Sequence, residues 1–72
     1  MIEIEFGALA PKLTEQIKDQ TGALSDGQMS DIDTIQKDAD AVNRLYVRGV
    51  LSEAATRTAR KRLMNKIAKV LD

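Results

Sequence analysis

The chain contains no cysteine, no histidine and no tryptophan, and its aromatic side chains are limited to Phe6 and Tyr46. Without cysteine no disulfide can form, and without histidine as well the usual zinc-ligand sets are missing. A domain of 72 residues rarely reaches more than roughly 3–5 kcal/mol of net stability without further help. We therefore expect one small domain over residues 1–72, an aliphatic core, no metal, no cofactor, and self-association as the simplest stabilising device.

Long apolar runs are also missing. No stretch approaches the roughly 20 apolar residues that a membrane span requires. The N-terminus lacks the basic and apolar regions of a secretory signal. We therefore expect a cytoplasmic protein with no membrane partner.

Charge is sorted along the chain although its formal total is zero. Residues 1–36 carry two basic and seven acidic side chains, a net charge of −5, whereas residues 37–72 carry nine basic and four acidic side chains, a net charge of +5. Because binding depends on local fields, the neutral total does not exclude an anion-binding face. The same polarity allows one copy to attract the opposite end of another.

The N-terminal residues have the pattern of a half-buried strand. Ile2, Ile4 and Phe6 alternate with two glutamates, which is a period of two, and Gly7 ends the pattern. A lone strand leaves backbone donors and acceptors unpaired. The strand over residues 1–7 therefore either lies across the helices as a local arm or pairs with the same strand of a second copy. In the second case Ile2, Ile4 and Phe6 form an oligomer interface.

A short first helix is predicted between Pro11 and Gly22. Proline suits the first turn of a helix and glycine suits the position just beyond its end. Leu9, Leu13 and Ile17 recur at four-residue spacing and form its expected apolar face.

Two longer helices are predicted after a loop over residues 22–29. Ser30 or Asp31 is the expected cap of the second helix, which ends near Gly49, and Ser52 is the expected cap of the third. The short connection between them predicts an antiparallel hairpin. The expected inner faces are Ile32, Ile35, Ala39, Val42 and Tyr46 on the second helix, and Ala55, Ala59, Leu63, Ile67 and Val70 on the third. The predicted fold is thus mainly α, with three helices and a short N-terminal strand.

Catalytic residues are scarce. There is no cysteine nucleophile and no histidine base, and the serines occupy predicted turn or cap positions. The closely spaced aspartates stand two residues apart, so on a helix they point to different sides. No constellation with mutual geometry is present, and we expect a protein that is not an enzyme.

The basic run at the start of the third helix is the best functional candidate. Arg57, Arg60 and Lys61 share a helix face by their three- and four-residue spacing. Such a patch can take phosphate or carboxylate groups, with threonine hydroxyls as further donors. An ordinary solvated helix face is the competing interpretation. The candidate ligand- or partner-binding residues are Arg57, Arg60, Lys61, Arg44, Arg48 and Thr56, the second-helix arginines extending the patch across the hairpin.

Two stretches carry a resemblance. FGALAPKLTEQI over residues 6–17, and QKDADA, LYVRGVLSE and RLMNKI within residues 36–67, resemble short uncharacterised proteins encoded by phages and prophages of Gram-positive bacteria. The segment from Leu45 to Ile67 is similar to the C-terminal helical hairpin called SHOCT. The first resemblance implies a protein that works in the host cytoplasm by occupying something, as an anti-defence or regulatory protein would. The second implies an oligomerising or docking module.

The functional hypothesis is a non-enzymatic binding protein that acts as a homo-oligomer by stoichiometric association. Its partner is expected to be a host protein or a phosphate-bearing, nucleotide-like ligand. One alternative is a nucleic-acid-binding regulator that uses the basic third helix, whose affinity would fall with salt. The other alternative is a purely structural oligomer in which the basic patch is passive.

Overall fold

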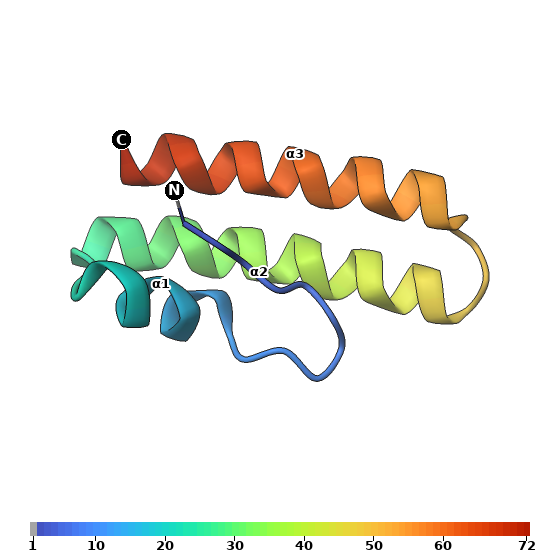
Figure 1. The fold of residues 1–72 in the computed structure, drawn as a ribbon, viewed down its shortest axis with the longest axis horizontal. Helices are drawn as coiled ribbons and strands as arrows, with labels where there is room; N and C mark the ends of the chain where they lie inside the picture. The colour runs from blue at the N-terminus through green and yellow to red at the C-terminus, as the bar shows by residue number, and fades with distance from the viewer. Residues whose placement is uncertain (1) are drawn as a thin grey trace.

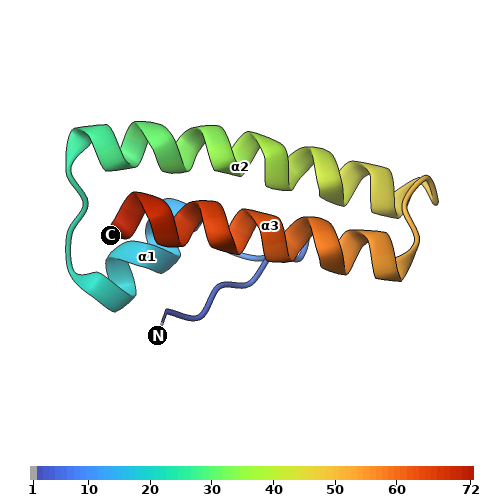
Figure 2. The same ribbon diagram turned by 90° about the horizontal axis from the view of Figure 1, so that it is seen from above.

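The computed structural model describes residues 2–72 and shows three α-helices there, with no β-strand (Figure 1). Helix α1 spans Leu13–Thr21, α2 spans Asp26–Val47 and α3 spans Glu53–Leu71. Helices α2 and α3 lie side by side as an antiparallel hairpin, and α1 packs on α2 at the end where both termini lie (Figures 1 and 2). The molecule measures 36 × 19 × 18 Å along its principal axes. The prediction of a mainly helical, three-helix chain is confirmed.

None of these three helices, within residues 2–72, combines the length and the apolar character that crossing a bilayer would require.

The loop expected over residues 22–29 is shorter than predicted, because α2 begins directly after Ser25. The Ser25 hydroxyl accepts a hydrogen bond from the Gln28 N–H at 3.2 Å, and the Gln28 side chain accepts one from the Ser25 N–H at 3.0 Å. This reciprocal capping box satisfies two donors that otherwise lack partners. Ser25, rather than Ser30 or Asp31, is therefore the cap of α2.

The start of α1 differs from the prediction, because the helix begins at Leu13 and Pro11 precedes it instead of lying in its first turn. The remaining helix ends follow the predictions. Gly22 ends α1 at a φ of +90°, and its N–H donates to the Lys18 carbonyl at 2.8 Å. Gly49 has a φ of +76° in the turn after α2. The Ser52 hydroxyl caps α3 by accepting from the Ala55 N–H at 3.1 Å. Both glycines occupy left-handed backbone conformations that a side chain would strain.

The core is aliphatic, as the lack of aromatic residues predicts. Its buried members come from all three helices: Leu13, Ile17, Ile32, Ile35, Ala39, Leu63 and Ile67. Leu9 is fully exposed because α1 begins only at Leu13, and Tyr46 is partly exposed because the inner face of α2 leaves the core near its end.

The inner face of α3 is rotated by one residue at its start. Thr56 is 3% exposed, whereas Ala55, which was expected inside, faces solvent. The buried hydroxyl donates to the Ser52 carbonyl at 2.8 Å, so its burial leaves no unsatisfied donor. Thr56, Leu63 and Ile67 then follow one another on a single face of the helix.

The predicted N-terminal strand is wrong for residues 2–7, since no strand exists among the described residues; Met1 lies outside them. The alternation nevertheless indicates one-sided burial correctly. Ile2, Ile4 and Phe6 are half-buried against the core of their own chain, and the two glutamates between them are exposed. Within one chain the segment is a local extended arm, and pairing with a second copy stays a prediction.

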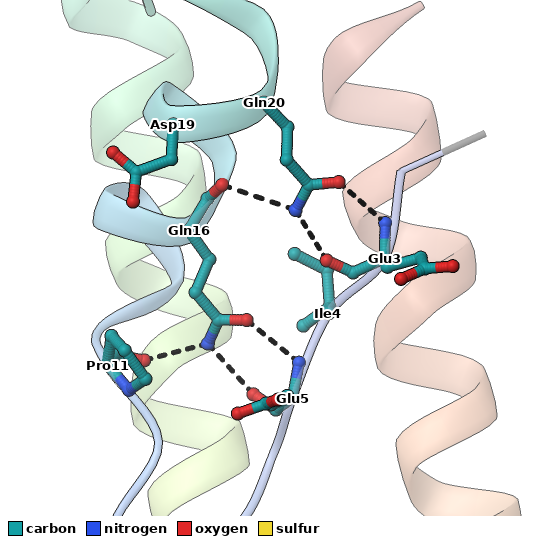
Figure 3. A pocket seen from close by; sticks show the side chains of 7 residues that line it. All are labelled: Glu3, Ile4, Glu5, Pro11, Gln16, Asp19 and Gln20. Carbon is teal, nitrogen blue, oxygen red and sulfur yellow. Dashed lines mark hydrogen bonds between the residues drawn. The ribbon is translucent and has the colours of Figure 1, made fainter.

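Two glutamines of α1 replace the partner strand that the arm lacks (Figure 3). The Gln20 amide accepts from the Glu3 N–H at 2.8 Å and donates to the Glu3 carbonyl. The Gln16 amide accepts from the Glu5 N–H at 2.8 Å and donates to the Glu5 carbonyl at 2.9 Å. Gln16 and Gln20 are four helical residues apart, a rise of about 6 Å, and Glu3 and Glu5 are two extended residues apart, a rise of about 6.6 Å. The two spacings therefore match.

This pairing predicts a local effect of replacing Gln16 by alanine. Glu5 would lose both backbone partners, so we expect hydrogen exchange of the Glu5 amide to accelerate more than that of the Glu3 amide, which Gln20 still holds. Because these groups are exposed to water, the free energy of unfolding should fall by only about 1 kcal/mol. NMR hydrogen exchange and urea denaturation measure the two effects. Lys18→Ala on the same helix is the control, and unchanged exchange at Glu5 would contradict the pairing.

Candidate anion-binding site

Six of the eleven basic side chains lie at one end of the molecule, which we call the hairpin tip and define as residues 43–62. This segment comprises the end of α2, the turn and the first half of α3, opposite the two termini (Figure 1). It holds six basic side chains and one acidic side chain, a net charge of +5, and the other residues hold five basic and ten acidic, a net charge of −5. The charged members of the tip are Arg44, Arg48, Arg57, Arg60, Lys61, Arg62 and Glu53.

The cations of the tip have no carboxylate partner in the part of the chain that the structure describes. The ion pair found within residues 2–72 joins Lys66 Nζ to Asp38 Oδ2 at 3.6 Å, outside the tip. The charged nitrogens of the tip therefore all lie more than 4.0 Å from every carboxylate oxygen of residues 2–72. The positive field of the tip remains available to an anion from outside the chain.

Arg60 is the best-positioned of these cations. Its guanidinium donates to Asn43 Oδ1 at 3.0 Å and lies 6.0 Å from the centroid of the Tyr46 ring. Its Nε is buried and has no hydrogen-bond partner among residues 2–72. Asn43 in turn donates to the Phe6 carbonyl at 2.7 Å, so the arm and both long helices together hold one guanidinium in place.

A cleft of about 250 Å³ opens beside this guanidinium. Its lining residues are Tyr46 from α2 and Glu53, Thr56, Arg57 and Arg60 from α3. The cleft thus combines two guanidinium groups, one carboxylate and part of an aromatic ring. Guanidinium groups form forked hydrogen bonds to phosphate and carboxylate oxygens, so the chemistry of the cleft favours an anionic group.

The threonine hydroxyls are not available as hydrogen-bond donors to an anion, contrary to the expectation from the sequence. The Thr56 hydroxyl proton is committed to the Ser52 carbonyl, and Thr58 donates to the Ala54 carbonyl at 3.1 Å. Neither is a free donor for a ligand, because a hydroxyl carries a single proton. Thr56 lines the cleft as a buried side chain and not as the additional donor that the sequence suggests.

The six predicted site residues do not form one patch. Arg57 and Arg60 meet at the cleft, while Lys61 is exposed and does not line it. Arg44 and Arg48 line a separate hollow on the other side of α2.

The helical rotation explains this separation. Each residue turns about 100° around the axis, so Tyr46 falls on one side of Asn43 and Arg44 on the other. The second-helix arginines therefore do not extend the Arg57–Arg60 cleft across the hairpin.

Sequence reasoning did not assign Asn43 and Tyr46 to the site. Asn43 is the informative omission, because it is a polar amide beside the apolar positions Ala39, Val42 and Tyr46 of α2. A polar side chain at such a place needs a partner. That requirement was the available signal, although it does not identify Arg60 as the partner.

A second depression, of about 580 Å³, lies between the arm and α1 and is lined in part by Glu3, Glu5 and Asp19 (Figure 3). Figure 3 shows the carboxylates of Glu3 and Asp19 pointing in opposite directions. No group of three acidic side chains in residues 2–72 is arranged to hold a metal ion. The amides in this depression are already bonded to the arm. It therefore offers no comparable arrangement of ligand-binding groups.

No protein-family model, curated protein or solved structure matches the chain.

The contacts of the two cleft arginines predict different effects on stability. Arg60→Ala removes the hydrogen bond to Asn43, the contact with Tyr46 and a partly buried stem, so we expect the free energy of unfolding to fall by about 1–2 kcal/mol. Arg57 is exposed and makes no comparable contact, so Arg57→Ala should change it by less than about 0.5 kcal/mol. Urea denaturation of the two variants measures this difference. Equal losses would show that Arg60 is not held as described.

Proposed function

We propose that the protein is a non-enzymatic binding protein whose hairpin-tip cleft takes a phosphate-bearing ligand. The proposal rests on how the Arg60 guanidinium is held and on the lack of a charge partner beside it in the described part of the chain. This guanidinium is partly buried and is held by Asn43 and Tyr46, yet no carboxylate oxygen of residues 2–72 lies within 4.0 Å of it. Arg57 lies about one helical turn before Arg60 and lines the same cleft. The two together suit the oxygens of a phosphate group.

Fixing Arg60 in advance favours binding. An arginine side chain that is mobile before binding loses conformational entropy when a ligand orders it. This loss reduces the binding free energy by about 0.5–1.5 kcal/mol for each such side chain. Arg60 has already been ordered by folding. The cleft also offers the Tyr46 ring and the Glu53 carboxylate, which fit the ring and N–H groups of a nucleotide-like ligand.

Stoichiometric binding is a better account of the cleft than catalysis. Glu53 is the one carboxylate that lines it, and the chain has no histidine or cysteine to act beside it as base or nucleophile. The arginines and the ring can hold and orient a ligand without transferring a proton. A protein of this kind acts by occupying its ligand or partner. The resemblance to phage proteins adds that this partner belongs to the host cell, which stays a prediction.

Titration with pyrophosphate, followed by NMR of backbone amides, tests the cleft. We expect the shifts to centre on residues 43–46 and 52–60, and Arg57→Ala to weaken binding at least tenfold. Arg62→Ala is the matched control, because it removes the same charge from an exposed position outside the cleft. Equal weakening by both variants would contradict a defined cleft and indicate diffuse attraction, as a nucleic-acid-binding protein would show.

Self-association is part of this proposal and makes a separate prediction. Ile2, Ile4 and Phe6 pack on the core of their own chain, so they contribute to an interface if two copies exchange arms. We expect light scattering after size-exclusion chromatography to report a dimer or larger species. In a mixture of differently labelled copies, amide contacts between Gln16 of one copy and Glu5 of the other would support the exchange. A monomer at all concentrations would refute the oligomer.

A further inference from the structure

The second hollow of the hairpin tip differs in chemistry from the cleft. Its volume is about 230 Å³ and its lining residues are Ala8, Asn43, Arg44, Val47 and Arg48. The exposed walls are almost entirely apolar. The arginines therefore line it mainly through their methylene stems, which leaves their charged groups for the rim.

Exposed apolar side chains line this hollow or follow its lining residues closely in the chain. Val47 is 75% exposed and Val50, in the following turn, is 66% exposed. Leu9 directly follows Ala8 in the chain and is fully exposed. All the large apolar side chains that are exposed in residues 2–72 belong to the tip or to this neighbouring loop: Leu9, Leu45, Tyr46, Val47 and Val50.

We infer that this hollow, together with Val50 and Leu9, is a docking surface for an acidic amphipathic segment of a partner protein. An apolar side chain of the partner enters the hollow, and its carboxylates meet Arg44 and Arg48 at the rim. The tip has a net charge of +5, so only an acidic partner complements it. The apolar walls need apolar side chains from the same partner.

A second copy of this chain offers either negative charge or exposed apolar side chains to the hollow, but not both from the same end. A copy that presents its own tip brings exposed apolar side chains but also a charge of +5, which repels. A copy that presents its opposite end brings carboxylates but, among the described residues, no exposed large apolar side chain. A nucleic acid supplies the charge without a side chain for the hollow. The acidic amphipathic segment satisfies both requirements.

The test uses a labelled peptide of about 16 residues, with leucine at positions i, i+3, i+4 and i+7, glutamate at the positions beside the leucines and alanine elsewhere to favour a helix, and measures fluorescence anisotropy. We expect saturable binding. Val47→Gln and the double variant Arg44→Gln/Arg48→Gln should each weaken it at least tenfold, while Arg62→Gln should change it less than twofold. NMR shifts should centre on residues 8–9 and 43–50.

Control ligands determine whether the hollow is the site. Loss of binding when alanine replaces the leucines supports the inference, and unchanged binding overturns it in favour of charge alone. Stronger binding to anionic phospholipid vesicles or to duplex DNA than to the peptide overturns it in favour of those partners. Concentration-dependent shifts of residues 43–50 without peptide overturn it in favour of a second copy.

The two surfaces of the tip can be tested separately. Val47→Gln should leave pyrophosphate binding within twofold of the wild type, and Arg57→Ala should leave peptide binding equally unchanged. Failure of the peptide to bind, with pyrophosphate binding intact, refutes the docking surface and not the cleft. Equal effects of both variants on both ligands would refute two separate surfaces.

Discussion

The structure depends on finding hydrogen-bond partners for backbone groups that lie outside the helices or at helix ends. Buried or half-buried N–H and C=O groups are costly when unpaired. An amide side chain can satisfy both kinds at once, because it donates and accepts. Gln16 and Gln20 do so for the exposed backbone of the arm. Three further amides each satisfy one part-buried backbone group: Gln28 donates to the Val70 carbonyl, Gln36 accepts from the Leu13 N–H and Asn43 donates to the Phe6 carbonyl.

The same contacts connect the fold to the candidate site. Gln36 accepts from the first N–H of α1 at 2.7 Å, a position where the chain provides no local side-chain cap. That bond helps place α1, whose glutamines place the arm, and the end of the arm meets Asn43. Asn43 then orients Arg60. A small core with no disulfide thus gains order from amide bonds between segments far apart in the sequence, and the cleft lies at the end of that series.

Local patterns were sufficient to predict the helices and much of the core, because helical periodicity and caps depend on neighbouring residues. Local patterns were insufficient wherever a side chain contacts a residue far away in the sequence. Alternation in residues 2–6 indicates one buried face, but a partner strand and a pair of glutamines produce the same pattern. The bond between Asn43 and Arg60 spans 17 positions, and no local signal joins them. The rotation of α3 that buries Thr56 likewise depends on how the helices pack. The arginines were found, but their division between two surfaces was not.

The position of the tip explains why it carries both charge and exposed apolar groups. Helix α1 packs on α2 at the other end, and the core residues lie at Leu13 to Ala39 and at Leu63 and Ile67. At the tip two helices alone cannot bury all of their apolar surface.

The six cations of the tip, which have no carboxylate partner among residues 2–72, also repel one another, and this repulsion lowers the stability of the free chain. An anion or an acidic partner bound there removes part of that repulsion, so binding stabilises the folded state. Binding of the proposed ligands and the stability of the hairpin would therefore be coupled through the same charges.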